Sequence, residues 1–401
     1  MEPQRIPGAA RVLNVRQNDL TARARAAAEV ARANAAAVDA EARFPNEAFA
    51  EIRRQRLLGI QVPQTLGGEA ASIAEIADVC YILGQACSSA ALIYAMHQIK
   101  MACIVRHCKG NAALERILGR IVSEQLLMAS STTEGQAGGN VRSSEAAVQR
   151  EGDQVTLERK ATVISYAVEA DGVVTTARRA ADAAGSDQVL LVLLKSDYTL
   201  ERLQVWDTLG MRGTHSEGFT LRARAPADQI MPEPYDRIHA QTMVPFAHLL
   251  WGSVWAGIAA AAATKAQAFI RHAARGANGQ MPPGAPHFTQ AVSTLRTLRG
   301  VLAANLRSYE AIMSDDKAIS SLEFQAMITL TKVQASELAV TTVLSSLRAC
   351  GLSGYRNDTE FTIGRLLRDV LSAPLMINND RILANLATTS LMTPLPTSIS
   401  G

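Results

Sequence analysis

Aromatic residues are scarce in this chain, at 4% of the sequence, although 48% of the residues are hydrophobic. Alanine is abundant instead, and small helix-favouring side chains indicate closely packed helices rather than an all-β protein. The chain has 401 residues. This length exceeds the size at which one hydrophobic core usually keeps growing, so the sequence predicts two or three domains.

An excess of charge of one sign is also absent. The formal net charge is +3, from 40 basic and 37 acidic residues. This balance argues against nucleic acid or an anionic membrane surface as the main partner. It remains compatible with a local basic site for a phosphorylated ligand.

Cysteine is limited to five residues, and none of them forms a C-x-x-C pair. Cys103 and Cys108 flank His107, but in a stretch rich in alanine and isoleucine, where buried thiols are expected and no metal site is predicted. An odd number of cysteines without a disulfide framework favours a reducing compartment. The first residues include no apolar signal region, and no run reaches about 18 uninterrupted apolar residues. We therefore expect a cytoplasmic protein without a membrane span.

The first part of the chain has a helical pattern, from about residue 20 to residue 127. Ser72 and Glu75 have the spacing of a capping box, and apolar residues then follow at helical intervals. A second amphipathic run covers residues 112–121. Residues 1–127 are therefore predicted to form an N-terminal α-helical domain.

The pattern changes after Met128, where glycines and short β-branched runs replace the helical period. Runs of this kind occupy residues 154–158, 173–176, 189–194 and 219–222. Their spacing predicts a small antiparallel β-domain over residues 128–234. Helices return from Thr242 onward, so residues 235–401 are predicted to form a C-terminal helical domain. Residues 276–286 form a Gly/Pro-rich connector within it.

Several motifs in this helix–sheet–helix order resemble those of one family. They are Leu57 to Pro63 with Leu66-Gly67-Gly68, Met128 to Asn140, Lys160 to Ser165, Leu209 to Gly213, and Gly351 to Asp369. In this order and spacing, the sequence resembles the acyl-CoA dehydrogenases. The resemblance implies an α+β multidomain fold with an N-terminal helical domain, a middle antiparallel β-domain and a C-terminal four-helix bundle.

The motif around Thr132-Thr133-Glu134 is similar to the flavin signature of that family. An isoalloxazine ring needs hydrogen-bond partners along its pyrimidine edge and a close approach of backbone without side chains. By resemblance, Ser130 and Thr132 present backbone groups to FAD and Thr133 its hydroxyl. Gly138 and Gly139 allow the close approach. Ser165 is implied to lie near the ring.

Three further residues are implied to bind the flavin of a second subunit. Arg275 corresponds to an arginine that binds pyrophosphate, a role that suits a guanidinium fork. Gly351 and Gly354 correspond to glycines beside the adenosine portion. A solvated cation at a helix end explains Arg275 equally well, and a helix C-cap explains Gly351. The resemblance thus implies a homo-oligomer, either a dimer or a homotetramer.

Departures from the family concern the catalytic base above all. Dehydrogenation removes a proton beside the thioester carbonyl, so a carboxylate must lie within hydrogen-bond reach. The usual glutamate position holds Ile377, and the alternative position on an earlier helix holds Ala247. His248 and Asp380 are the remaining weak candidates. The more ordinary interpretation of His248 is a helix histidine with satisfied hydrogen bonds. That of Asp380 is a surface residue that pairs with a neighbouring arginine.

The flavin side also departs from the family pattern. The ring-stacking aromatic is replaced by Val163, the phenylalanine after the pyrophosphate arginine by Asn278, and the adenosine-side glutamine by Arg348. A substrate cavity is expected between the middle sheet and the helices around residues 94–97 and Trp251. Met96 and His97 could be either core or cavity residues.

Three functions therefore remain open. The first is FAD-dependent α,β-oxidation of an acyl thioester, bound to CoA or to a carrier protein, with an atypical or missing base and a separate electron acceptor. The second is N- or S-hydroxylation by a monooxygenase of the same fold. It would need a flavin reductase and could use FMN, and the reaction of flavin with oxygen replaces the base. The third is a non-catalytic helical scaffold.

Overall fold

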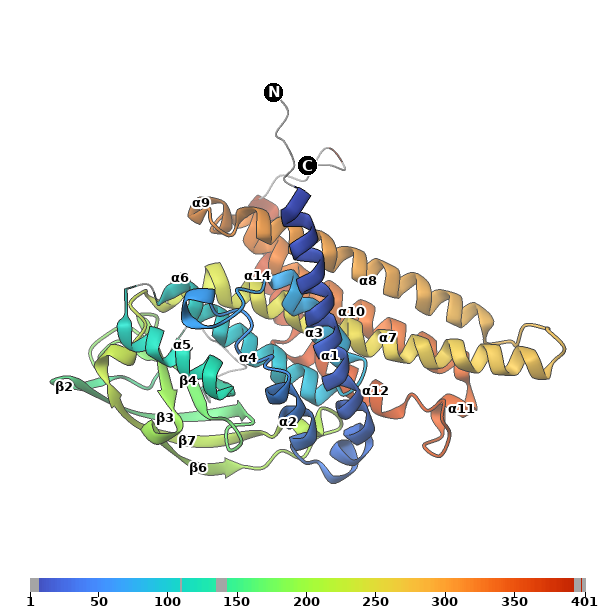
Figure 1. Cartoon of the computed structure of the whole chain (residues 1–401), viewed down its shortest axis with the longest axis horizontal. Helices are drawn as coiled ribbons and strands as arrows, with labels where there is room; N and C mark the ends of the chain where they lie inside the picture. Colours follow the sequence, from blue (N-terminus) through green and yellow to red (C-terminus); the bar gives the residue numbers. More distant parts are fainter. Residues whose placement is uncertain (1–6, 109, 135–142, 393–397, 399–401) are drawn as a thin grey trace.

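The structure is a computed structural model that describes residues 7–108, 110–134, 143–392 and 398. Five helices come first (Figure 1): α1 Pro7–Glu41, α2 Asn46–Arg54, α3 Ile73–Gly84, α4 Ser88–His107 and α5 Ala112–Glu124. The predicted capping box is present, because the Ser72 side chain accepts from the Glu75 N–H and the Glu75 carboxylate accepts from the Ser72 N–H. It fixes the start of α3.

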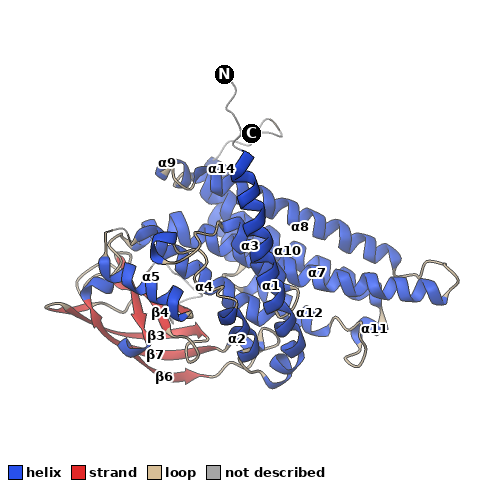
Figure 2. Cartoon of the chain, in the orientation of Figure 1, coloured by secondary structure: helices blue, strands red, loops and turns tan. Residues whose placement is uncertain are grey.

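The strands all lie between residues 128 and 226 in the described part of the chain (Figure 2). They are β1 Met128–Ser131, β2 Gln149–Glu151, β3 Gln154–Ser165, β4 Gly172–Arg178, β5 Gln188–Leu194, β6 Tyr198–Gln204 and β7 Ser216–Pro226. One sheet has the order β1-β4-β5 and the other the order β2-β3-β7-β6. The expectation of an antiparallel sheet needs one correction, because β1 pairs parallel with β4.

Helices return after the sheets. They are α6 Tyr235–Ile238, α7 Val244–Gly276, α8 Ala285–Ile312, α9 Asp316–Ile319, α10 Leu322–Cys350, α11 Leu352–Tyr355, α12 Gly364–Val370, α13 Ser372–Leu375 and α14 Asn379–Met392. The long helices α7, α8 and α10 pack together, and α14 packs against α10. In Figure 1 the far ends of α7 and α8 extend away from the sheets.

One described helix, Tyr235–Gly276, is long and apolar enough to cross a membrane. Almost all of its apolar stretch is buried inside the fold, where α3, α4, α8 and α10 pack around it. This burial is that of a core helix, for which a hydrophobic surface on all sides is expected.

The crossing of α3 and α7 depends on two glycines. A Cβ atom on Gly257 would lie 2.4 Å from the carbonyl oxygen of Tyr81, and one on Gly84 would lie 2.6 Å from that of Val254. These distances are shorter than any van der Waals contact. The two helices therefore approach at a point where neither backbone tolerates a side chain.

Two of the family-like motifs meet in space, although about 160 residues separate them. The Met211 N–H donates to the Asp369 carboxylate over 2.7 Å, and the Arg368 guanidinium donates to the Leu209 carbonyl over 2.9 Å. A Cβ atom on Gly210 would lie 2.1 Å from the Arg368 carbonyl oxygen. These motifs join the β-region to the C-terminal helices and serve the fold.

Candidate active site

A cavity lies where helix α4, strand β1 and the start of helix α7 come together. Its empty volume is about 470 Å³. The lining residues are Met96, Ile99, Lys100, Ser130, Thr132, His239, Met243, Val244, Ala247, His248, Trp251 and Ile377. A cavity is therefore present where the sequence predicted one for the substrate, beside Met96 and Trp251. It brings together the start of the flavin-like motif and both positions at which the family places its glutamate.

Neither glutamate position supplies a carboxylate. Ile377 and Ala247, the residues that the resemblance puts at these positions, both line the cavity. Ile377 also has a φ of 53°, a left-handed conformation that is unusual for a β-branched side chain. Among the described residues that line the cavity, no aspartate or glutamate is present. The site thus lacks the group with which dehydrogenation would begin.

His248 lies in the cavity wall with a defined hydrogen bond. Its Nδ1 is 2.9 Å from the Ile328 carbonyl oxygen, which can only accept, so Nδ1 carries the proton. Burial lowers the pKa of His248 to about 4, and the ring is neutral at pH 7. Its Nε2 is then a hydrogen-bond acceptor and a weak base. His248, a weak candidate for the base from the sequence, lines the cavity beside Ala247.

Trp251 follows one helical turn later, with its ring centroid 6.2 Å from that of His248. The indole Nε1 is buried and has no hydrogen-bond partner in the described chain. A buried N–H without a partner costs free energy, so a ligand that accepts from it would be stabilised there.

Strand β1 carries the start of the flavin-like motif and forms the outer edge of its sheet among the described strands. Ser130 and Thr132 line the cavity. The Thr175 hydroxyl donates to the Ser131 carbonyl over 3.0 Å, and the buried Ser131 hydroxyl has no partner in the described chain. An edge strand leaves backbone groups free for a ligand.

Glu134, in the flavin-like motif, contacts strand β3 of the other sheet. Its carboxylate lies 3.1 Å from the buried Arg159 guanidinium, and it also accepts from the Ser144 hydroxyl and the Glu145 N–H. Glu134 combines this ion pair with its other hydrogen bonds, and it thereby compensates the buried charge of Arg159. Glu134 is thus engaged by Arg159, Ser144 and Glu145, and it does not line the cavity.

Lys100 is the cavity residue that sequence reasoning missed. Its side chain comes from α4, is only 3% exposed, and lies with Nζ 3.5 Å from the sulfur of Met243. Burial lowers its pKa to about 8. The signal in the sequence was a single lysine inside the apolar run of residues 90–104, at a position that the helical period assigns to the interior.

His239 and Met243 reach the cavity from a π-helical turn, His239–Met243, between α6 and α7. Such turns often occur at functional sites. Tyr235 lies against His239, with ring centroids 5.5 Å apart. Periodicity alone cannot reveal a π-helical turn, so His239 also escaped prediction.

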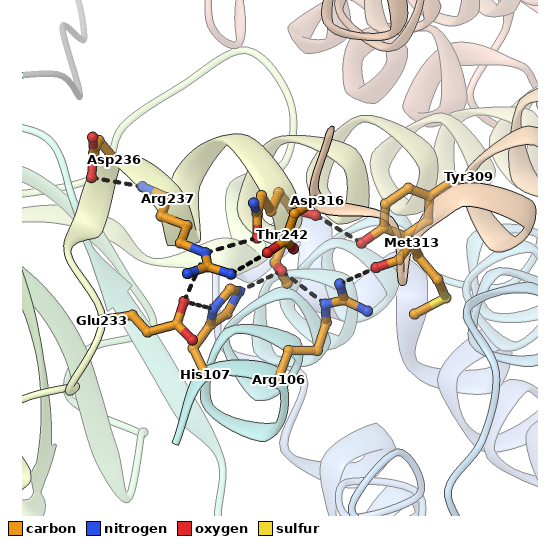
Figure 3. A network of polar contacts seen from close by, with 10 residues as sticks. Arg106, His107, Glu233, Asp236, Arg237, Thr242, Tyr309, Met313 and Asp316 are labelled. Carbon is orange, nitrogen blue, oxygen red and sulfur yellow. Dashed lines mark hydrogen bonds and ion pairs between the residues drawn. The ribbon is translucent and has the colours of Figure 1, made fainter. Parts of the chain in front are cut away.

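A polar network holds this turn against α4 (Figure 3). Arg106 Nε donates to the Thr242 hydroxyl oxygen over 3.0 Å, and that oxygen lies 2.7 Å from His107 Nε2. The other nitrogen of His107 lies 2.8 Å from Glu233, which also pairs with Arg237. Burial lowers the pKa of His107. His107 thus links α4 to Glu233 and to Thr242 of the π-helical turn.

His97 belongs to the core. Its Nε2 is 2.8 Å from the Leu58 carbonyl oxygen, and its Nδ1 accepts from the Met128 N–H over 3.0 Å. Both ring nitrogens are therefore satisfied, whereas the neighbouring Met96 lines the cavity.

Among the described residues, the other predicted flavin residues do not line the cavity. The Ser165 hydroxyl lies 2.7 Å from that of Ser216, in a buried chain of hydroxyls that continues to Thr214. Thr133 is half-buried just beyond the cavity residue Thr132. Gly138 and Gly139 lie outside the described residues. Asp380 is exposed in the first turn of α14 and does not line the cavity.

The three residues assigned to a second subunit lie at the far end of the long helices. Arg275 is exposed in the last turn of α7, 24 residues after Trp251, which corresponds to roughly 36 Å along the helix. Gly351 follows α10 with a φ of 55°, a value that glycine adopts readily. Gly354 is buried, and a Cβ atom there would lie 2.6 Å from the Cβ of Cys350. Within one chain, Arg275 cannot reach the cavity.

Comparison with known proteins agrees with this geometry. Residues 16–125 match the family "Acyl-CoA dehydrogenase, N-terminal domain". The chain is 25% identical to the "Probable acyl-CoA dehydrogenase fadE25" of Mycobacterium leprae, over 88% of this chain and 89% of that protein. A second relative, the "Probable acyl-CoA dehydrogenase YngJ" of Bacillus subtilis, is 23% identical over 83% of this chain and 86% of its own length.

Solved structures with the same fold include monooxygenases. The FMN-bound form of TdsC from Paenibacillus sp. A11-2, a dibenzothiophene monooxygenase, superimposes with a TM-score of 0.83 at 17% identity, over 94% of this chain and 98% of TdsC. KijD3 in complex with FMN and a dTDP-amino-keto sugar superimposes with a TM-score of 0.80 at 22% identity, over 95% of each chain. These likenesses concern the fold.

The class that fold and site define is thus an acyl-CoA dehydrogenase-like protein. More particularly, the chain carries an acyl-CoA dehydrogenase N-terminal domain over residues 16–125, followed by the sheets and C-terminal helices of the same fold. The predicted fold is confirmed, and residues 16–125 match the N-terminal domain of the family that the sequence resembles. At the level of the family, the findings also agree with a flavin-dependent oxidoreductase, while the substrate stays open.

Proposed function

We propose that this protein is a flavin-dependent monooxygenase that uses the acyl-CoA dehydrogenase-like fold without its proton-abstracting carboxylate. The observation that carries the proposal is the cavity itself, in which Ile377 and Ala247 occupy both glutamate positions. Dehydrogenation needs a base at the substrate carbon, whereas oxygen transfer does not. Monooxygenases among the solved structures of this fold support the same choice.

The residues present fit a flavin ring beside β1. Ser130 in the edge strand β1 and Thr132 just after it offer backbone hydrogen-bond partners, and the Trp251 Nε1, which has no partner in the described chain, offers a donor to a ligand. When bound, a reduced flavin supplies the two electrons with which O₂ becomes one hydroxyl group on the substrate and one water. We infer FMN or FAD, with Ser130, Thr132 and Thr133 as binding residues.

The chain's own residues bind and orient the substrate. The apolar side chains of Met96, Ile99, Val244 and Ile377 exclude water from the reacting atoms. The neutral His248 accepts a hydrogen bond at Nε2 from a hydroxyl or amine of the substrate. Trp251 donates from its indole N–H. Such an arrangement suits an apolar molecule with few polar groups.

Binding of the flavin phosphates implies a homo-oligomer, either a dimer or a tetramer. Arg275, Gly351 and Gly354 lie at the ends of α7 and α10, which extend away from the sheets (Figure 1), so a partner subunit is needed to bring such residues to this chain's flavin. If FAD is bound, they are its expected contacts across subunits. A cytoplasmic location and a separate flavin reductase complete the proposal.

Dehydrogenation of an acyl thioester remains the second candidate, because the curated relatives are named probable acyl-CoA dehydrogenases. One experiment separates the two. The purified protein is supplied with flavin and mixed without oxygen with a panel of acyl-CoA thioesters, and then with NADH, a flavin reductase and oxygen. Monooxygenation predicts a flavin band that only the reductase bleaches. Bleaching by a thioester would establish dehydrogenation.

A further inference from the structure

The cavity contains a buried positive charge without a counter-charge. Lys100 is 3% exposed, and its one recorded contact within the described chain is the thioether of Met243, 3.5 Å from Nζ. Sulfur of this kind is a weak acceptor. Every other lining residue in the described chain is apolar, a histidine, a tryptophan or a hydroxyl residue.

Among the described residues, no nearby group compensates this charge. Cys103 lies one turn along α4, and burial raises its pKa to about 11, so it is a neutral thiol. Arg159 approaches from β3 as a second cation, but Glu134 pairs with it. Glu233 is engaged by His107 and Arg237. Lys100 therefore keeps an ammonium group that is removed from water and unpaired.

A buried ammonium without a partner is costly, and an anion that pairs with it and completes its hydrogen bonds offsets much of that cost. Arg159 shows how this protein compensates a buried cation where no ligand is meant to enter. At Lys100 no described residue provides the same compensation, and the side chain lines the cavity. The missing partner is then expected from the cavity's ligand.

We propose that Lys100 binds an anionic oxygen of the substrate, a carboxylate, so that the substrate is an organic acid with an apolar body. This inference rests on one part of the proposed function, namely that this cavity binds the substrate. The apolar lining receives the body, and Lys100 selects molecules that carry the acid group. A neutral hydrocarbon or alcohol of the same size leaves the charge unpaired and binds less well.

The test uses pairs of probes that differ only in the charged group. Binding of hexanoate and 1-hexanol, and of 3-phenylpropionate and 3-phenylpropanol, is measured by calorimetry at pH 7 and constant ionic strength. The wild-type full chain is used as purified, with and without added FMN. We expect each acid to bind at least tenfold more tightly than its alcohol. In Lys100→Met and Lys100→Gln the ratio falls to about one.

Lys195→Met is the matched control, because Lys195 is an exposed lysine bound to the Ala167 and Val168 carbonyls and remote from the lining. It keeps the wild-type preference. The proposal is overturned if the alcohols bind as well as the acids to the wild type, or if the preference survives in both Lys100 variants. It is also overturned if the Lys100 variants lose bound FMN instead, since Lys100 would then serve the cofactor. The experiment measures binding and not turnover. If the protein proves not to be a monooxygenase, the preference for acids is therefore still tested.

Discussion

The amino nitrogen of Lys100 lies 3.5 Å from the sulfur of Met243, so that a residue of α4 meets one of the π-helical turn across the cavity wall. This contact joins the two features that distinguish the site. One is a buried cation in a cavity whose described lining contains no carboxylate. The other is an irregular turn that the network around Thr242 holds in place.

Replacement of Lys100 by methionine should stabilise the protein at neutral pH. The folded-state pKa of Lys100 is about 8 against an ordinary 10.5, so the unfolded chain binds more protons between these values. Stability is therefore reduced below pH 8 and recovers as the pH rises towards 10.5. The full difference is worth roughly 3 kcal/mol. We expect Lys100→Met to gain about 1–3 kcal/mol at pH 7 in urea unfolding.

The same comparison at pH 10 checks the cause. The advantage of Lys100→Met over the wild type should shrink, because the wild-type amine is then largely neutral in the folded state. Lys195→Met should show no such gain. A Lys100→Met protein that is less stable than the wild type at pH 7 would mean that the ammonium is well compensated.

Replacement of Thr242 by valine should destabilise the π-helical turn. The Thr242 hydroxyl meets both Arg106 and His107, which would lose a partner inside the network (Figure 3). Leaving buried polar groups unpaired costs about 1–3 kcal/mol. Thr264→Val on α7 is the control, because its hydroxyl only bonds the Ala260 carbonyl of its own helix. Equal losses in chemical unfolding would refute a special role for Thr242.

Replacement of Gly257 by alanine should disturb the crossing of α3 and α7. The new Cβ would lie 2.4 Å from the Tyr81 carbonyl oxygen, so backbone has to move. Overpacking of this kind costs about 1–3 kcal/mol. Gly276→Ala, at the end of the same helix, meets nothing within 4 Å and should be neutral or slightly stabilising. Thermal unfolding of both variants distinguishes the two positions, and an unchanged Tm in Gly257→Ala would contradict the packing argument.

Replacement of Ile377 by glutamate should introduce the missing base. Ile377 lines the cavity and is 37% exposed, so a carboxylate there remains hydrated enough to ionise. We expect Ile377→Glu to bleach its flavin with at least one acyl-CoA thioester without oxygen. Leu375→Glu is the control, since Leu375 is 73% exposed and outside the lining. Identical behaviour of the two variants would show that position 377 does not reach the reacting carbon.

Much of the fold could be predicted because its signals are local. The capping box at Ser72 and the β-branched runs became α3, β3, β4, β5 and β7 at the expected places. Strand β6, Tyr198–Gln204, was missed because its burial alternates poorly and most of its residues are exposed. The parallel pairing of β1 with β4 depends on contacts across 44 residues, which a local pattern does not contain.

The candidate site was predictable only in part. The positions of Ile377 and Ala247 followed from motif spacing, and both line the cavity. Lys100 and His239 could not be predicted from local periodicity. The burial of Lys100 depends on tertiary packing. The π-helical turn shifts the helical phase at His239, and the sequence pattern does not show this shift. Asp380 was offered for its spacing from Ile377, but the chain turns at Asn378, φ 21°, before α14 begins.

The most direct test of the account is the flavin absorbance of the wild-type protein under two reducing conditions. Without oxygen, a panel of acyl-CoA thioesters should leave the oxidised flavin band unchanged, while NADH with a flavin reductase should bleach it. Admission of oxygen should then restore the band, with hydroxylated product formed when an organic acid substrate is present. Bleaching of the wild-type flavin by an acyl-CoA thioester alone would contradict the account, because the cavity would then contain a competent base.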